Sequence, residues 1–312
     1  MDLTIFAGSA NLPLAESIAS EHGLRLGHRT LQRFPDGELH IELQDSIRGH
    51  DVYIIQPTGP PVDENLMDLL FLADASRRAG ATQLTAIVPY LAYARQDRRA
   101  TGRESVSARL TADLIKTSGF KRVVAVDLHS AVLEGFFGIP LEHLSAVPIL
   151  AQALAALMPA RAVIVAPDLG AVKLAERYTK LLHLPMAIVH KTRISGEAVE
   201  THGIVGDVRG RSPIVVDDMI STGGTVEAAL QAVFAAGSVP PAVVVSSHAL
   251  LVGPAVERLR ALPLTRLIVT DSVSVATDLP LPMKIVSLSP LLAEAIKRLH
   301  ESRSLSHLIA HG

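Results

Sequence analysis

The segment Pro213–Thr225 combines residue types that can bind a phosphorylated ligand. The apolar run Ile214–Val216 is typical of a buried parallel strand, and two carboxylates, Asp217 and Asp218, come directly after it. Small residues let backbone N–H groups converge on an anion, and a following helix points its positive end at the same place. We interpret residues 221–225 as a phosphate loop, and the two acids before it as possible partners of sugar hydroxyls. An ordinary strand-to-helix turn is the alternative. The loop residues are Ser221, Thr222, Gly223, Gly224 and Thr225.

Two more polar segments follow predicted strands. Asp127-Leu128-His129 comes after the apolar run Val123–Val126, and Asp168 comes after Val163–Ala166. In open α/β sheets, ligands lie beyond the carboxyl ends of the strands. An imidazole beside a carboxylate can bind a divalent cation or a phosphate oxygen, although such a histidine can also serve only in packing. Taken alone, Asp168 is better interpreted as a helix N-cap than as a ligand.

A basic segment runs from Pro89 to Arg103 and holds four arginines within its last nine residues. Arginine forks suit the oxygens of a polyphosphate, and Gln96 or a tyrosine could flank a base. A solvated loop is the alternative. RNA binding is disfavoured, because the chain has only 7 Phe and 4 Tyr and they are not interleaved with the basic residues.

Two shorter segments have weaker signals. Phe34-Pro35-Asp36-Gly37-Glu38 is a turn by composition, and an exposed phenylalanine between acids could stack on adenine. Lys191-Thr192-Arg193, followed by Ser195–Glu197, is interpreted as a mobile loop with two cations. Such a loop could close over a transferring phosphoryl group, and simple solvent exposure is the alternative.

The composition excludes several classes of protein. The 312 residues are 48% hydrophobic and 19% charged, which argues against disorder, and the net charge of −2 argues against a basic surface for nucleic acid. The chain has no cysteine, which excludes thiolate chemistry and fits a reducing cytoplasm. Residues 1–8 lack a signal-peptide pattern, and no apolar run is long enough to span a membrane. We therefore expect a soluble, cytoplasmic protein with no nucleic-acid or membrane partner.

Strand-like and helical patterns alternate along the chain, which predicts an α/β fold with mainly parallel sheets flanked by helices. There are too many strands for one domain of ordinary size, so we expect two. The best boundary lies near Pro140–Val147, which gives domains at 1–141 and 142–297, with the tail, about 298–312, packing back on the first domain. The predicted strands are Leu3–Ala7, Val52–Ile55, Leu84–Val88, Val123–Val126, Val163–Ala166, Met186–Val189, Ile214–Val216, Val243–Val245 and Leu267–Thr270.

Taken together and in this order, these segments resemble the ribose-phosphate diphosphokinase family, whose members make phosphoribosyl diphosphate (PRPP). The resemblance covers nearly the whole chain. It implies two phosphoribosyltransferase-like domains with the active site between them. It also implies a homo-oligomer, either a hexamer or a smaller dimer-based assembly, with active sites near subunit interfaces. The motifs that carry it are Phe34–Glu38, Tyr93–Asp97, Asp127–His129, Gly135–Phe137, Pro167-Asp168, Gly206–Val208 and Val216–Thr225.

The resemblance also implies roles for individual residues. Ribose 5-phosphate would place its phosphate on Ser221–Thr225 and its ring hydroxyls near Asp217 and Asp218. Lys191 and Arg193 match the family's catalytic flexible loop. Mg²⁺, the expected cofactor, would be held near two further residues, His129 and Asp168. ATP would contact six residues: Arg95, Gln96, Asp97, and, from a neighbouring subunit, Phe34, Asp36 and Glu38.

The chain departs from the family pattern at four places, one of which is Ser246-Ser247-His248 where the family has a Thr-His element. Thr192 replaces a basic residue of the flexible loop, Ser221 stands where many members have an aspartate, and Ala171 replaces a glycine. None of these removes an indispensable group. Two alternatives remain: a phosphoribosyltransferase that consumes PRPP, and a non-catalytic regulatory homologue. The length and the segments Phe34–Glu38 and Arg95–Asp97 favour the synthetase.

Overall fold

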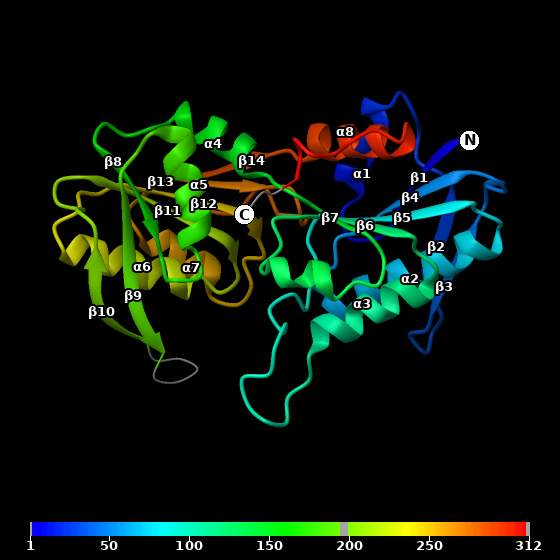
Figure 1. Cartoon of the computed structure of the whole chain (residues 1–312), viewed down its shortest axis with the longest axis horizontal. Helices are drawn as coiled ribbons and strands as arrows, with labels where there is room; N and C mark the ends of the chain where they lie inside the picture. Colours follow the sequence, from blue (N-terminus) through cyan, green and yellow to red (C-terminus); the bar gives the residue numbers. More distant parts are fainter. Residues whose placement is uncertain (1, 194–198, 310–312) are drawn as a thin grey trace. The chain divides into compact units, whose positions relative to one another are not determined.

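The computed structural model describes residues 2–193 and 199–309, and at 191–193 and 199–202 it describes the backbone alone. The chain divides into two compact units (Figure 1). The first comprises Met1–Ser145, Ser272–Ser274 and Ser287–His311, and the second comprises chiefly Ala146–Asp271 and Val275–Val286. Within the described residues, no helix is long and apolar enough to cross a membrane.

The first unit is built on a parallel five-stranded sheet in the order β1-β4-β5-β6-β7. Buried aliphatic side chains dominate its strands, as expected for a sheet that is covered on both faces. Helices α1 and α8 pack against each other, as do α2 and α3, and Figure 1 shows the two pairs on opposite sides of the sheet. The strands are β1 (Leu3–Ala7), β4 (Asp51–Ile55), β5 (Gln83–Val88), β6 (Arg122–Val126) and β7 (Leu141–Leu144), and the helices are α1 (Leu12–Glu21), α2 (Val62–Arg78), α3 (Ser107–Ser118), the short 3₁₀ helix η1 (Ala131–Gly135) and α8 (Ser289–His300).

An antiparallel hairpin of β2 (Arg29–Arg33) and β3 (Leu39–Leu43) belongs to the same unit. Its turn holds Phe34–Glu38, so the predicted turn is confirmed, although the two flanking strands were not predicted. The hairpin is anchored at its base, where Arg29 donates from Nε to the carbonyl of Ala7 (2.5 Å) and from a terminal nitrogen to that of Gly8 (2.9 Å).

The second unit is a seven-stranded sheet in the order β10-β9-β8-β11-β12-β13-β14, in which only β10 runs antiparallel to its neighbour. From β8 the chain crosses through α5 to β9 on one side, and from β11 it crosses through α6 to β12 on the other side. β8 and β11 therefore flank a topological switch point, where open sheets place ligands. The strands are β8 (Ala162–Ala166), β9 (Met186–Arg193), β10 (Val199–Val205), β11 (Ser212–Ile220), β12 (Ala242–Ala249), β13 (Leu264–Thr270) and β14 (Met283–Val286), and the helices are α4 (Val147–Ala155), α5 (Val172–Leu182), α6 (Gly224–Ala235) and α7 (Ala255–Ala261).

The structure corrects two sequence-based predictions. Lys191–Arg193 was expected in a loop, but its backbone belongs to β9, which pairs with β10 in an antiparallel register. β11 does not end before Asp217 and Asp218 but continues to Ile220, because Asp217, Met219 and Ile220 keep their pairing with β12. The compact units also differ from the expected limits, since α8 lies in the first unit and packs on α1.

A buried polar contact joins α8 to the sheet of the first unit. Asp51 of β4 accepts hydrogen bonds from the Tyr53 hydroxyl (3.1 Å) and from Nδ1 of His300 in the last turn of α8 (2.8 Å). Burial is the main cause that raises the pKa of Tyr53, and the neighbouring Asp51 adds to it. A buried carboxylate is costly unless its oxygens are paired, so His300 contributes to the docking of α8.

We predict that His300→Ala weakens the docking of α8 by about 0.5–1.5 kcal/mol, because it removes one of the two hydrogen bonds that Oδ2 of Asp51 accepts. The measurement is hydrogen exchange of the α8 amides, which reports local opening. Arg303→Ala, which breaks an exposed ion pair with Glu301 just beyond α8, is the matched control and should leave the exchange unchanged. Equal exchange in both variants would contradict the prediction.

Candidate functional site

The phosphate loop lies at the switch point of the second unit, between the end of β11 and the start of α6. Gly223 has φ +77°, a left-handed conformation that favours glycine, and it directly precedes the first turn of α6. The N-cap residue, Gly223, has no side chain with which to cap the helix. The amides of a helix N-terminus together with its dipole form an anion site.

Arg258 of α7 supports this loop and was missed by the sequence analysis. It donates a hydrogen bond from a terminal nitrogen to the carbonyl of Thr222 (3.1 Å), and its Nε lies 3.6 Å from Glu227 on α6. The loop is also held by backbone, since Val252 donates to the carbonyl of Ser221 (3.0 Å). An arginine thirty-six residues away in sequence leaves no local signal, which is why the motif did not reveal it.

The two aspartates of β11 stand at the base of the same site. Asp218 donates its backbone N–H to Oδ1 of Asp217 (3.0 Å), and Met219 does the same to Oδ1 of Asp218 (2.9 Å). The pKa of Asp217 is raised well above its ordinary value, first by burial and then by the charges of Asp218 and Asp168. Three carboxylates are therefore close enough to repel one another at the ends of β8 and β11.

Asp168 follows β8 but is not the N-cap of α5 that the sequence favoured, because Ala171 occupies that position. Its Oδ1 accepts backbone N–H groups from Gly170 (2.9 Å) and Ala171 (3.2 Å), so it orders the turn before α5. It also acts on Asp217 through its charge. The turn thus engages one carboxylate oxygen, Oδ1, in the part of the chain that the structure describes.

The remaining predicted residues of the described chain lie in the first unit, in three separate turns. Phe34 is 47% exposed at the hairpin tip, where its ring centroid lies 5.6 Å from that of His40. The tip is braced by Arg33, which donates to the carbonyl of Gly37 (3.0 Å) and pairs with Glu64 of α2 (2.9 Å). Asp36 accepts the backbone N–H of Glu38 (3.0 Å).

Arg95, Gln96 and Asp97 occupy the turn after β5. Gln96 is fixed by Ser107, whose hydroxyl donates to its Oε1 (2.6 Å), whereas the exposed Arg95 guanidinium has no partner among the described residues. His129 is exposed in the turn after β6, next to the buried Asp127. Lys191 and Arg193 lie on the β9 backbone, and their side chains are outside the described residues.

The structure thus brings together Asp168, Asp217, Asp218 and the loop Ser221–Thr225, all within the second unit. His129 and the predicted ATP residues belong to the first unit. Among the described residues, no group of three or more histidine and acidic side chains is arranged to hold a metal ion by itself. Mg²⁺ is commonly bound through one or two carboxylates plus substrate phosphates, so a site completed by substrate is compatible with this arrangement.

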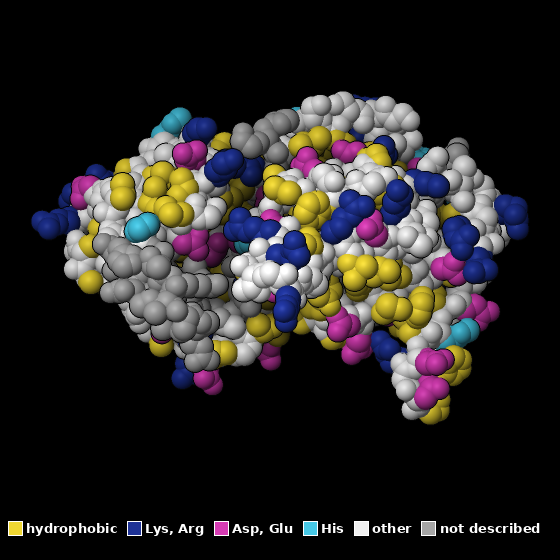
Figure 2. Space-filling view, turned by 60° about the horizontal axis from the view of Figure 1, so that its bottom comes forward, with side chains coloured by type: hydrophobic (Ala, Val, Ile, Leu, Met, Phe, Trp, Pro, Cys, Tyr) yellow, Lys and Arg dark blue, Asp and Glu magenta, His cyan; other side chains and the backbone are white. Residues whose placement is uncertain are grey.

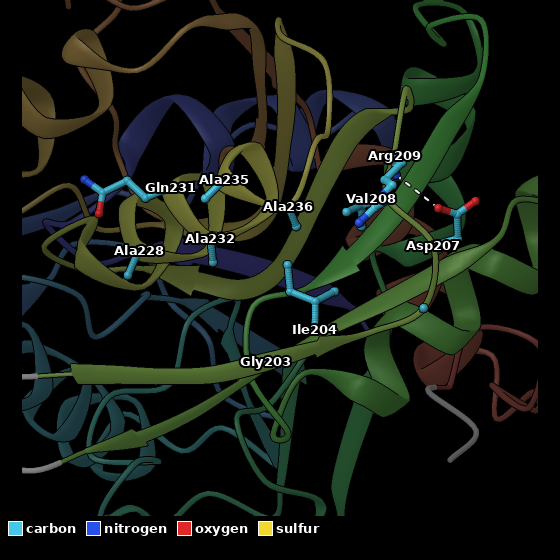
Figure 3. A pocket seen from close by; sticks show the side chains of 11 residues that line it. Gly203, Ile204, Asp207, Val208, Arg209, Ala228, Gln231, Ala232, Ala235 and Ala236 are labelled. Atoms are coloured by element: carbon cyan, nitrogen blue, oxygen red, sulfur yellow. Dashed lines mark hydrogen bonds between the residues drawn. The ribbon is translucent and has the colours of Figure 1, made fainter.

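A cavity of about 640 Å³ lies elsewhere in the second unit, along the outer part of α6 (Figure 3). Figure 3 shows Ile204 of β10 pointing toward the alanines of α6. Gly206 closes one side, where φ +107° and a carbonyl 2.5 Å from any added Cβ both require glycine. None of the predicted site residues lines this cavity. Its walls include Gly203, Val208, Arg209, Ala228, Gln231 and Ala232.

A carboxylate pair and a glycine loop at the switch point of a parallel sheet, in a chain of two α/β units, define a phosphoribosyltransferase-like α/β protein. The N-terminal domain of ribose phosphate pyrophosphokinase matches residues 3–119, and the phosphoribosyl synthetase-associated domain matches residues 197–310. The chain belongs to the ribose-phosphate pyrophosphokinase family, as the sequence resemblance predicted, and is therefore an enzyme of the class that transfers diphosphate groups.

Individual relatives support this membership over the full length. The ribose-phosphate pyrophosphokinase of Prochlorococcus marinus is 43% identical over 98% of this chain and 93% of its own length. That of Staphylococcus epidermidis is 42% identical over 98% and 96%. The crystal structure of the phosphoribosylpyrophosphate synthetase from Mycobacterium smegmatis superimposes with a TM-score of 0.90 at 36% identity, covering 97% of this chain and all of that one.

We predict that Asp217→Asn flattens the pH dependence of stability of the second unit. The native state keeps a proton on Asp217 that the unfolded state releases above the ordinary pKa of 3.8, so wild-type stability falls as pH rises from there through the raised pKa. Asparagine cannot ionise and removes this contribution. The measurement is the free energy of unfolding in urea across this pH range.

Asp278→Asn, at an exposed aspartate of the same unit, is the matched control. Its pH profile should match the wild type. If Asp217→Asn also kept the wild-type slope, the mutual repulsion inferred for the three carboxylates would be wrong.

Proposed function

We propose that this enzyme makes PRPP by transferring the β,γ-diphosphoryl group of ATP to the anomeric hydroxyl of ribose 5-phosphate, with AMP as the second product. The observation that carries the proposal is the convergence of the phosphate loop with Asp217, Asp218 and Asp168, in a chain that matches pyrophosphokinases from end to end. That end-to-end match favours the synthetase over a phosphoribosyltransferase.

In this proposal the second unit binds the acceptor. The N–H groups of Ser221–Thr225 and of the first turn of α6 hold the phosphate, with Arg258 keeping the loop in place from behind. The ring hydroxyls donate hydrogen bonds to Asp217 and Asp218. Binding both ends of the pentose fixes the direction of its anomeric oxygen, so the acceptor is held in the geometry that the transfer requires.

ATP binds to the first unit in the proposal. The exposed guanidinium of Arg95, which has no partner among the described residues, contacts phosphate oxygens, and Gln96 and Asp97 complete that turn. The adenine lies against Phe34, with Asp36 and Glu38 beside it, and these three residues come from a neighbouring subunit. An aromatic side chain that is 47% exposed at the tip of a braced hairpin is suited to stacking on a base.

Mg²⁺ is the proposed cofactor, with His129 and Asp168 as its protein ligands. The donor chemistry fits, because burial and then the charges of Asp218 and Asp168 raise the pKa of Asp217, and a divalent cation would relieve the repulsion among these carboxylates. When bound, the cation supplies neutralisation of phosphate charge. Lys191 and Arg193 neutralise the negative charge that develops on the transferred group and on the leaving AMP.

We predict that the purified protein with Mg²⁺, ATP and ribose 5-phosphate releases AMP and PRPP in equal amounts, measured by anion-exchange chromatography. Lys191→Ala should lower kcat about a hundredfold or more with little change in the KM for ATP, because its charge acts in the transition state. Lys180→Ala, on α5, is the control and should retain full activity. Release of ADP would contradict the proposal, and substrate binding without turnover would favour the non-catalytic homologue.

Homo-oligomerisation is also proposed, through the outer face of α2 and α3. Met67 and Phe71 on α2 and Leu110 and Leu114 on α3 are 39–60% exposed at i, i+4 spacing. Figure 2 shows hydrophobic side chains gathered on this side of the first unit. Some neighbouring charges are paired within these helices, since Asp113 lies 2.9 Å from Arg109 on α3 and Asp74 lies 2.6 Å from Arg77 on α2. A neutral apolar face suits a second copy of the chain, in which each surface meets its own equivalent.

We predict that Leu110→Lys shifts the protein toward smaller assemblies, because it places a charge in the centre of this face. Size-exclusion chromatography with light scattering measures the mass of the assembly. Val239→Lys, at an apolar residue of the second unit that is 46% exposed, is the control and should leave the mass unchanged. An unchanged mass for Leu110→Lys would exclude the α2–α3 face as the interface.

A further inference from the structure

The turn Asp127–His129, which carries the proposed metal ligand His129, has an unfavourable backbone conformation. Asp127 has φ +37°, in a region that side-chain-bearing residues rarely adopt. Asp127 is also buried, so the turn cannot relax by moving into solvent. Such a conformation persists only where surrounding contacts fix it.

The end of β7 supplies those contacts. Asp127 donates its backbone N–H to the carbonyl of Leu144 (3.0 Å), and Ser145 donates its hydroxyl to Oδ1 of Asp127 (3.0 Å). Between them, the backbone N–H of Leu128 donates to Nε2 of His143 (2.8 Å). The imidazole therefore accepts a hydrogen bond from the residue that directly precedes His129.

The ring of His143 is fixed in the orientation that this bond needs. Because Nε2 accepts, the proton is on Nδ1, and Nδ1 lies 3.4 Å from Oε1 of Glu134 in η1. The side chain is only 10% exposed, so water does not readily replace it. The strand that carries it is held from its other side, where Ser145 donates its N–H to the carbonyl of Leu308 (3.1 Å) and Leu144 bridges to Ile309.

We propose that His143 is a positioning residue for the metal site: by accepting the Leu128 N–H, it holds the Asp127–His129 turn in the conformation in which His129 binds the divalent cation. The role of His129 rests on the proposed function. The contribution of His143 rests on the geometry of the turn itself. Partners that orient a metal ligand typically account for a factor of 10–100 in metal affinity.

The test is Mn²⁺ binding to the full-length protein in the presence of ribose 5-phosphate, followed by the electron paramagnetic resonance signal of free Mn²⁺. His143→Met removes the acceptor at similar volume and should weaken binding about tenfold. His143→Gln, whose Oε1 can occupy the position of Nε2, should restore binding to within about threefold of wild type. Glu142→Gln, on the same strand but paired with Arg122, is the matched control and should bind normally.

Wild-type affinity in His143→Met, or equal losses in His143→Met and His143→Gln, would overturn the proposal. So would a loss that follows the thermal midpoint of each variant, because that indicates general destabilisation. If His143→Met does not fold, the ¹⁵N chemical shifts of the wild-type His143 ring test the proposal instead. A proton on Nε2 would refute the proposal, because Nε2 could then not accept the Leu128 N–H. Absence of PRPP synthesis in wild type, with Mn²⁺ binding still sensitive to His143, would count against the proposed function alone.

Discussion

The repulsion among three carboxylates at one edge of a sheet governs the second unit. Parallel strands bring their carboxyl ends to the same edge, and the chain leaves β8 and β11 in opposite directions at that point. Asp168, Asp217 and Asp218 are partly exposed there, and the pKa of Asp217 is raised first by burial and then by the charges of the other two. Such an arrangement destabilises the protein without ligand and becomes favourable only with positively charged or hydrogen-bond-donating partners. The proposed sugar hydroxyls and Mg²⁺ are partners of these two kinds.

Much of the fold could be predicted from sequence because its strands are short, continuous aliphatic runs. β6 and β8 were located to within one residue for this reason. The strand predictions fail where polar residues are buried, or where apolar residues are only partly buried. β12 continues through Ser246, Ser247 and His248, which are polar yet buried, and the sequence suggested a strand that stopped before them. The hairpin β2–β3 was missed although Leu39, Ile41 and Leu43 alternate with polar residues, since its two strands are short and only partly buried and β2 has a single large apolar residue, Leu31.

The candidate site was predictable to the extent that it consists of contiguous motifs. The carboxylate pair and its loop come from one stretch of chain, and a helix start following a strand has a local signature. Residues that hold the motifs in place have no such signature. Arg258, Arg33 and His143 reach their loops from α7, β2 and β7, and each bonds to a backbone group that any sequence would present. The assignment of Lys191 and Arg193 stays a prediction, and their backbone lies in a strand where a loop was expected.

Two turns beside the proposed ligand sites each contain a residue with positive φ, and they accommodate it in different ways. Before α6, glycine at 223 adopts φ +77° without steric cost, so the contacts that Arg258 and Val252 make with that loop do not have to offset backbone strain. After β6, Asp127 adopts φ +37° with a side chain attached, and hydrogen bonds from the end of β7 compensate. A glycine there would remove the strain, but it would also remove the carboxylate that accepts the Ser145 hydroxyl. The proposed metal ligand His129 needs a rigid turn that fixes its orientation, and Asp127 with its bonded carboxylate provides this rigidity. The proposed phosphate loop needs accessible backbone amides, and Gly223 suits that requirement.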